Sequence, residues 1–237
     1  MTDWDARYAE AGWAFGTEPN DFLREQARHL PAGGHVLCIA EGEGRNAVWL
    51  AQQGFHVTGI DVASIGLEKA QQLARERGVR ITTVVADLAS FELGSAAWDG
   101  IVSIFAHVPA AVRRRVHASV LTALKPGGVL LLEAYRPQQL ERATGGPPDD
   151  ERMLDRALAI RSSDGMIASG DSTGEIRLWD GRTGQYLRTF GTQGTNVGVL
   201  VYSPDGKRLL STCGGGGCST KPQIIWDMAS GKPLQQP

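Results

Sequence analysis

The sequence has no apolar run approaching the roughly 18 residues that a membrane-spanning helix needs, and its N-terminus lacks a basic segment followed by an apolar core. Its formal net charge is only -2, so the chain lacks the excess of basic residues that would indicate a polyanionic partner. These absences argue against membrane and nucleic-acid partners, and we expect a cytoplasmic protein. With 237 residues, 42% of them hydrophobic, the chain can fold as one large domain or two modest ones, and we expect two.

Cysteine and histidine are also scarce. The three cysteines, Cys38, Cys213 and Cys218, are an odd number, which argues against a disulfide framework and fits a reducing compartment. All five histidines lie at or before His117, so the C-terminal part cannot build a Cys/His zinc site of its own. We interpret the glycine-rich stretch 213–218 as a loop rather than a metal knuckle and expect no metal site.

What the sequence does contain, up to about residue 134, is an alternation of apolar strands and amphipathic helices. Strands are predicted at 35–39, 55–60, 79–85, 98–105 and 129–134, and helices at 22–30, 46–53, 65–77 and 109–124. The repeated strand–helix–strand order predicts an α/β, Rossmann-like parallel sheet with right-handed crossovers.

The first predicted strand leads into a glycine-bearing turn, VLCIAEGEGRN at 36–46. Gly42 and Gly44 allow the main chain to approach a ligand closely. Asp61 ends the second strand about 20 residues later, where a carboxylate either accepts hydrogen bonds from ribose hydroxyls or caps the next helix. Asp87 ends the third strand and either accepts from an adenine amino group, with Leu88 offering its amide, or serves as a cap or turn residue. Ala47 replaces the third glycine of a dinucleotide fingerprint, which disfavours a nicotinamide cofactor.

Together the segments AEGEGRNAVWLA, GIDVA, IFAHVP, LLLEAY and FGTEPNDFL resemble class I S-adenosylmethionine-dependent methyltransferases, and more narrowly the tellurite-resistance and thiopurine S-methyltransferase groups, over residues 1–154. The resemblance implies S-adenosylmethionine as the cofactor. It maps the methionine end to Gly42 and Gly44, the ribose to Asp61, and adenine to Asp87 with Leu88. The remaining residues expected at the cofactor are Ala40, Glu41, Asn46 and Val62.

The turn also departs from the family pattern. Cys38 and Ala40 stand where the family usually has a carboxylate and a glycine. We therefore hypothesise that Glu41 or Glu43 contacts the cofactor amine. Asn46 has a second interpretation, as a cap of the helix that follows the turn.

The resemblance implies methylation of a small molecule through a thiol, hydroxyl or chalcogen oxyanion. His107, after the fourth strand, either accepts the nucleophile's proton or only bonds a loop carbonyl. The expected substrate wall consists of Trp13, Phe15, Arg45 and Tyr135. The aromatic N-terminal segment that contains Trp13 and Phe15 either closes over the pocket or packs on the domain edge.

From about residue 157 the pattern changes to short strands separated by turns, and an internal repeat appears. Asp164-Gly165 recurs 41 residues later and Trp179-Asp180 recurs 47 residues later. The repeat resembles two WD-repeat blades of a β-propeller, which implies an all-β, antiparallel segment. We therefore divide the chain into a methyltransferase-like domain at 1–154 and an incomplete propeller at 155–237.

This division suggests a fusion or chimera in which the methyltransferase sheet stops after its fifth strand. The exposed edge of that strand predicts pairing with a strand from 157–237 or with a second chain. The blades also imply a protein partner or self-association. A non-enzymatic interaction module with a vestigial cofactor site is therefore the alternative function.

Overall fold

The computed structural model describes residues 3–135, 157–161, 166–170, 173–180, 185–195, 197–203, 205–213 and 223–235. The chain divides into two compact units, Met1–Ala134 and Tyr135–Pro237. The domain boundary predicted between residues 154 and 155 lies outside the described residues. Within the described part, no helix combines the length and hydropathy needed to cross a membrane.

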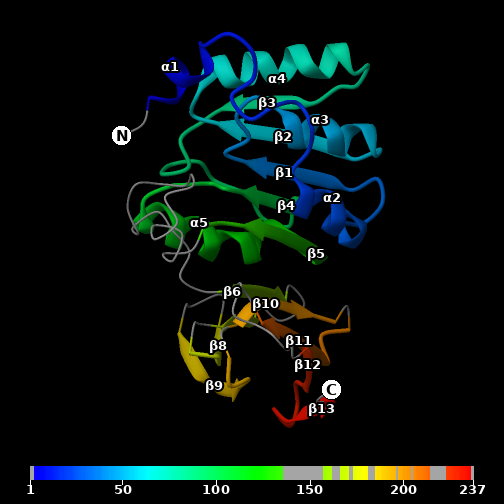
Figure 1. The fold of residues 1–237 in the computed structure, drawn as a ribbon, viewed down its shortest axis with the longest axis vertical. Coiled ribbons are helices and arrows are strands. Elements are labelled where there is room, and N and C mark those ends of the chain that lie inside the picture. Colours follow the sequence, from blue (N-terminus) through cyan, green and yellow to red (C-terminus); the bar gives the residue numbers. More distant parts are fainter. Residues whose placement is uncertain are drawn as a thin grey trace. The chain divides into compact units, whose positions relative to one another are not determined.

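The first unit is built on a five-stranded sheet in which every pair of neighbouring strands is parallel (Figure 1). The strands are β1 (His35–Ile39), β2 (His56–Asp61), β3 (Thr82–Val85), β4 (Trp98–Ile104) and β5 (Leu124–Glu133). Their order is β3-β2-β1-β4-β5, so the turn after β1 opens at the centre of the sheet's carboxyl edge. The predicted Rossmann-like parallel sheet is confirmed.

The helices of the first unit are α1 (Trp4–Tyr8), α2 (Asp21–Gln26), the 3-10 helix η1 (Ala27–His29), α3 (Arg45–Gln52), α4 (Ser64–Glu76) and α5 (Ala110–Ala123). The three predicted crossover helices are each correct to within one residue at either end. Strand β3 begins three residues later than predicted. Gly78, with a φ of 68°, ends α4 there, and the Val79 N–H still bonds the helical carbonyl of Ala74.

Strand β5 begins earlier than predicted, because residues 125–128, which lie between the predicted helix 109–124 and the predicted strand 129–134, belong to it. Trp98 pairs with Leu124 and Gly100 pairs with Val129, so the pairing of β4 with β5 shifts register between these two points. Gly127, with a φ of 82°, and its neighbour Gly128 therefore belong to the irregular first part of β5 and do not form a separate turn.

Apolar side chains from the central strands and the helices form one core in this unit. Cys38 and Val102 lie on neighbouring strands and are buried with Val48 and Leu50 of α3 and Leu73 of α4. This core fixes α3 and α4 against the sheet and thereby places the beginnings of both helices at its carboxyl edge.

The second unit contains two four-stranded antiparallel sheets. One consists of β6 (Ala157–Arg161), β7 (Met166–Gly170), β8 (Glu175–Asp180) and β9 (Tyr186–Thr192). The other consists of β10 (Val197–Tyr202), β11 (Arg208–Cys213), β12 (Gln223–Asp227) and β13 (Pro233–Gln235). The antiparallel strands that we predicted are present, whereas the WD-repeat character remains a prediction.

The sheet of the first unit ends with β5 among the described strands, and pairing of its edge with a strand from 157–237 or with a second chain remains a prediction. One expectation is overturned in the described residues. Cys213 is disulfide-bonded, contrary to the expectation from the odd cysteine count, whereas Cys38 is free and buried. The rest of the glycine-rich loop, residues 214–222, lies outside the described residues.

The turn after β1 depends on Gly44, and a matched pair of substitutions tests this. Gly44 and Gly54 both have a φ of 90°, but a Cβ on Gly44 would lie 2.5 Å from the Cβ of Ala70, whereas nothing lies within 4 Å of a Cβ on Gly54. We expect Gly54→Ala to lower the free energy of unfolding by about 1 kcal/mol through backbone strain alone. Gly44→Ala should lower it by roughly 3 kcal/mol or more, because overlap adds to the strain. Equal losses for the two variants in urea unfolding would contradict this account.

Candidate active site

The turn between β1 and α3 has an unusual backbone. Gly42 and Gly44 have positive φ angles of 63° and 90°, and Ala40 has a φ of 52°. Alanine in this left-handed region costs roughly 1–2 kcal/mol. Ala40 stands where the family that the sequence resembles usually has a glycine. Its backbone nevertheless has the left-handed conformation that glycine adopts most readily.

Asp61, at the carboxyl end of β2, holds this turn. Its Oδ2 accepts a hydrogen bond from the Gly42 N–H at 2.8 Å, and its Oδ1 accepts from the Ala63 N–H at 2.9 Å. Burial raises the pKa of Asp61, whereas the hydrogen bonds from Ala63 and Gly42 oppose that rise by favouring the carboxylate. One side chain therefore connects the turn after β1 to the beginning of α4.

Glu41 is almost fully buried and faces the beginning of α3. Its Oε1 accepts from the N–H groups of Asn46 at 3.2 Å and Ala47 at 2.8 Å. The N-cap residue, Gly44, has no side chain that could satisfy these donors. Burial raises the pKa of Glu41 to about 7. Glu41, one of the two glutamates that we expected at the cofactor amine, therefore caps α3 in this structure.

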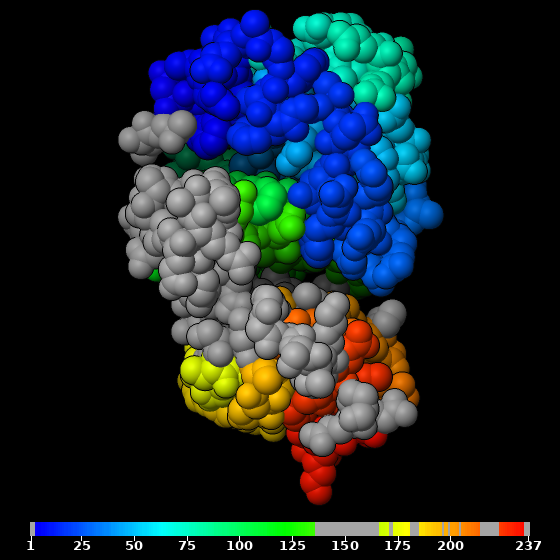
Figure 2. Space-filling view, viewed as in Figure 1, coloured from blue at the N-terminus to red at the C-terminus, as the bar shows by residue number. Residues whose placement is uncertain are grey.

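The N-terminal segment, residues 3–20, is fixed across the carboxyl edge of the sheet and is dark blue in Figure 2. Asp5 accepts from the Ile65 N–H in the first turn of α4 at 2.9 Å. Lys69 of α4 donates to the carbonyls of Glu10 and Gly12 at 3.0 and 2.7 Å and to Glu43 Oε1 at 2.8 Å. The segment is therefore tied to α4, and we call it the N-terminal strap.

Glu43 connects this strap to the glycine turn itself. While its Oε1 pairs with Lys69, its Oε2 accepts from the Ala14 N–H at 2.7 Å. The Glu43 side chain is only 4% exposed, so this ion pair is shielded from solvent on the carboxylate side. Trp13 lies beside it, with the Lys69 ammonium 5.9 Å from its ring centroid.

The end of the strap is fixed to α3 and β5. The Asn20 N–H donates to Asn46 Oδ1 at 3.0 Å, and Asn20 Nδ2 donates to Glu133 Oε2 at 2.7 Å. Arg45 donates to the carbonyl of Phe15 at 3.3 Å, and its guanidinium lies 5.9 Å from the Phe15 ring centroid. Burial raises the pKa of Glu133, which stands at the carboxyl end of β5. The structure thus groups Arg45 and Phe15 of the predicted substrate wall.

The remaining predicted residues lie along the same edge. Val62, directly after Asp61, is 55% exposed, and Val85, which pairs with Asp61 in the sheet, is 60% exposed. Asp87 is exposed, and its Oδ1 accepts from the Ala89 N–H at 2.8 Å, as in a turn. Leu88 is buried.

His107 and Tyr135 follow β4 and β5 and are both half-buried. The His107 ring lies 6.0 Å from the ring of Phe105, a residue with a φ of 52°. A positive φ in an aromatic residue is strained, so the chain turns sharply where β4 ends.

Several residues of the site were missed from the sequence, namely Tyr8, Asn20, Lys69 and Glu133. A Cβ on Gly42 would lie 2.6 Å from the Tyr8 hydroxyl, so Tyr8 packs directly on the turn. Burial, followed by the charges of Asp61, Glu43 and Glu41, raises the pKa of Tyr8. The position of Tyr8 in the aromatic N-terminal segment could have indicated a role at the site. The sequence around Lys69, in contrast, predicts only an exposed residue of a helix.

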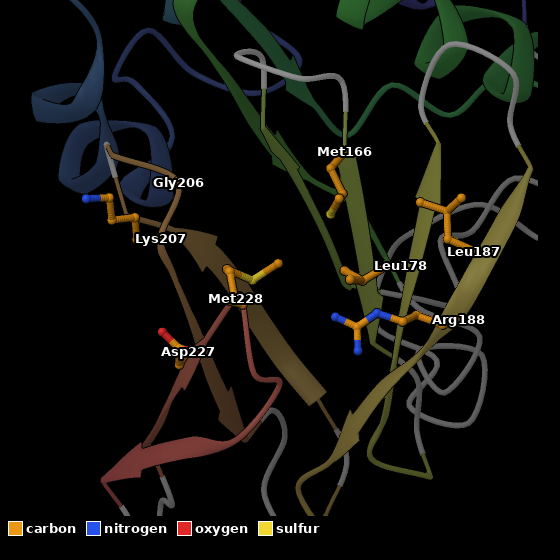
Figure 3. Close-up of a pocket in the computed structure, with 9 residues that line it drawn as sticks. Met166, Leu178, Leu187, Arg188, Gly206, Lys207, Asp227 and Met228 are labelled. Carbon is orange, nitrogen blue, oxygen red and sulfur yellow. The ribbon is translucent and has the colours of Figure 1, made fainter.

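A cavity of about 460 Å³ lies elsewhere, in the second unit (Figure 3). Met166 and Leu178 of one sheet and Met228 of the other point into it, with Arg188 and Lys207 also lining it. None of its lining residues belongs to the glycine turn or the strap, so this cavity and the site described above are separate.

The cap on α3 predicts a pH-dependent stability. Because the pKa of Glu41 is about 7 in the folded chain and 4.5 as its ordinary value, the folded state retains a proton that the unfolded state has lost between these pH values. The contribution of Glu41 to the free energy of unfolding should therefore fall as the pH rises from about 4.5 to 7, and it should stay constant above pH 7. We expect Glu41→Gln to raise the free energy of unfolding by roughly 1–3 kcal/mol at pH 8 and by less at pH 5, with a larger rise of the thermal midpoint at pH 8.

The exposed Glu68→Gln serves as the control and should change stability little at either pH. The same variants test the role of Glu41 at the cofactor by titration calorimetry. An unchanged dissociation constant for S-adenosylmethionine in Glu41→Gln would remove Glu41 from the cofactor site. A pH-independent effect on stability would contradict the buried cap.

Comparison with known proteins connects this geometry to a family. Residues 36–128, which run from β1 into β5, match the family model described as "Methyltransferase domain". The S-adenosyl-L-methionine-dependent Diels-Alderase iccD of Talaromyces variabilis is 29% identical over 58% of this chain and 47% of its own. A thiopurine S-methyltransferase of Bordetella petrii is 31% identical over 52% of this chain and 64% of its own.

The chain spans about half the length of the first curated relatives that it matches, between 47% and 53% of each. A solved structure from work on "Conversion of a Disulfide Bond into a Thioacetal Group during Echinomycin Biosynthesis" has a TM-score of 0.52 and 21% identity, over 79% of this chain and 88% of its own. That likeness concerns the fold alone. Residues 36–128 of this chain are thus similar to a methyltransferase domain, and the relatives that the chain matches include an S-adenosylmethionine-dependent protein and a thiopurine S-methyltransferase.

Proposed function

We propose that this chain transfers the methyl group of S-adenosylmethionine to a small molecule that carries a thiol, a hydroxyl or a chalcogen oxyanion. The observation that carries the proposal is the glycine turn held by Asp61 at the carboxyl edge of a parallel sheet. Ligands of open α/β sheets bind at this edge, where the strand order changes direction, and β1 stands at that change here.

The residues around the turn fit the cofactor. Gly42 and Gly44, together with Tyr8, would hold the methionine end. Each Asp61 oxygen accepts one backbone N–H and has a further lone pair, so Asp61 can still accept from ribose hydroxyls. Val62 and Val85 leave more than half of their surface exposed beside Asp61, which suits the face of an adenine ring.

The chemistry that we assign to the chain is mainly positioning. When bound, the cofactor supplies an electrophilic methyl group that is already activated, so the protein needs to align the acceptor in line with it. His107, after β4, would accept the proton of a thiol or hydroxyl acceptor. The N-terminal strap would exclude water from this edge.

Support for a small acceptor comes from the residues beside the strap. Phe15 is 54% exposed although it is aromatic, and the guanidinium of Arg45 lies over its ring. Trp13 lies on the same strap beside a second cation, that of Lys69. We therefore favour an acceptor with a planar body and an anionic or polarisable nucleophile.

We further propose that the second unit consists of two blades of the WD-repeat type. In each sheet the tryptophan of a Trp-Asp pair ends the third strand and donates from Nε1 to a serine on the second strand. Trp179 donates to Ser169 and Trp226 to Ser211, both at 2.8 Å. Recurrence of the same bond, buried at Trp226 and partly buried at Trp179, supports two copies of one structural repeat.

Titration calorimetry with S-adenosylmethionine tests the function. We expect saturable binding by the full chain and a loss of affinity of at least tenfold in Asp61→Asn, because the substitution removes a charge that accepts from both turn and ribose. Asp99→Asn is the matched control. Asp99 also accepts a backbone N–H, from His35 at 2.8 Å, but at the amino end of the sheet. We expect the affinity of Asp99→Asn for S-adenosylmethionine to stay within twofold of that of the parent chain.

Turnover is measured separately, as formation of S-adenosylhomocysteine with aromatic thiols, phenols and chalcogen oxyanions as acceptors. We expect His107→Ala to lower the rate by roughly tenfold to a hundredfold without changing cofactor affinity. Absence of cofactor binding by a folded sample would overturn the proposal. Binding without any product would instead favour a vestigial cofactor site.

The strap should be needed for tight cofactor binding. Lys69→Met removes the ammonium that holds the carbonyls of Glu10 and Gly12, and we expect cofactor affinity to fall roughly fivefold and cleavage near residues 10–15 by a protease to increase. The substitution also leaves the carboxylate of Glu43 buried and unpaired, which lowers stability. The double variant Lys69→Met with Glu43→Gln removes this second effect.

Lys125→Met is the control, because Lys125 also pairs with a carboxylate at 2.8 Å, that of Asp99, but at the amino end of the sheet. It should leave affinity and cleavage near residues 10–15 unchanged. If the Lys69 variants resembled the Lys125 variant in both measurements, the strap would have no role at the cofactor.

A further inference from the structure

The two sheets of the second unit pack through one face of each. The face of β6–β9 contributes Ala168, Leu178 and Phe190, and the face of β10–β13 contributes Leu209 and Trp226, all of them buried in one cluster. The Trp226 ring lies 6.0 Å from that of Phe190, and a Cβ on Gly191 would lie 2.7 Å from it. The face that bears Trp226 therefore fits against the face that bears Phe190.

The first sheet carries a copy of the Trp226 face on its other side. Trp179 pairs with Ile167 across β8 and β7, as Trp226 pairs with Leu209 across β12 and β11. Trp179 also donates to Ser169 in the same way as Trp226 donates to Ser211. Because neighbouring residues of a strand point to opposite faces, Trp179 and Ile167 lie on the side away from Ala168 and Leu178. We call this side the tryptophan face.

The second sheet, correspondingly, carries an apolar row on its outer side. Val201, Leu210 and Ile225 stand side by side on β10, β11 and β12, because Leu210 pairs with both of the others. Val201 is 41% exposed, and Leu210 and Ile225 are half-buried. By the pairing of the repeats, Leu210 corresponds to Ala168 and Ile225 to Leu178. We call this row the aliphatic face.

We propose that the aliphatic face of one copy of this chain packs against the tryptophan face of a second copy, repeating between chains the contact that joins the two sheets within a chain. Such a contact joins two different surfaces, so it is heterologous and continues from copy to copy until it closes. This inference rests on the proposed blade character of the two described sheets. Radial arrays of four-stranded sheets close with about four to eight members, so a ring to which each copy contributes these two sheets holds about two to four copies.

The contact between chains should be weaker than the contact within the chain. On the tryptophan face Arg177, paired with Glu175 at 2.6 Å, stands where the second sheet has Ile224. A more polar interface leads us to expect association that depends on concentration in the micromolar range.

Sedimentation velocity of the full chain from about 1 to 200 µM tests the proposal. We expect the parent chain to shift from monomer to an oligomer of about two to four copies. Trp179→Glu and Ile225→Glu each disable one face, because an unpaired charge would be buried, and each should raise the dissociation constant at least about thirtyfold. Val85→Glu, in the first unit, makes the same kind of change at an exposed apolar residue and should associate like the parent.

An equimolar mixture of the two variants decides the geometry. Trp179→Glu retains the aliphatic face and Ile225→Glu retains the tryptophan face, so the mixture should form a dimer of one copy each and nothing larger. A mixture that stays monomeric, or a parent chain that stays monomeric at every concentration, overturns the proposal. If either variant loses its far-UV circular dichroism, Trp179→Gln and Leu210→Glu replace them on the same two faces. The outcome does not depend on cofactor binding or methyl transfer.

Discussion

The hydrogen bonds that two carboxylates accept from the backbone hold the turn after β1, and the candidate site depends on them. Glu41 satisfies the first N–H groups of α3, and Asp61 accepts the Gly42 N–H while bonding the residue before α4. Both carboxylates are buried, so an unpaired N–H or an unpaired charge would be costly at either place. The left-handed backbone at Ala40, Gly42 and Gly44 persists because both ends of the turn are fixed in this way.

The strap extends the same principle across the carboxyl edge. Its main-chain groups bond to the side chains of Glu43, Asn46 and Lys69, and its Asp5 carboxylate accepts a main-chain N–H of α4. Asn20 reaches Glu133 of β5. Because these anchors are polar and few apolar residues of the strap are buried, it can separate from the sheet at a smaller cost than a core element. A segment held in this way can cover a bound cofactor and still release the product, which suits a site where exclusion of water matters.

Periodicity predicted the parallel sheet, and three helices to within a residue at either end, because strands buried on both faces and amphipathic helices leave strong local patterns. The positions of the turn glycines and of Asp61 at strand ends could also be predicted, whereas their roles at the cofactor remain predictions. The anchors were missed because Lys69 and Glu133 act on residues 57 and 113 positions away, and no local pattern distinguishes them from exposed charges. The hydrogen bonds of Glu41 to the beginning of α3 could not be predicted, because sequence alone does not show which way a turn side chain points.

In the second unit, the internal repeat explains why one set of residue types occurs in two environments. Trp226 is almost fully buried, because the neighbouring sheet covers the face that bears it, whereas Trp179 on the tryptophan face is half-buried. On the tryptophan face Arg177, paired with Glu175, stands where the second sheet has Ile224, which reduces the apolar surface of that face. The same change retains Trp179 and its bond to Ser169, so the face keeps the shape of a packing surface while tolerating water. Such a face suits association that is reversible, because neither the free nor the bound state leaves a large unpaired patch.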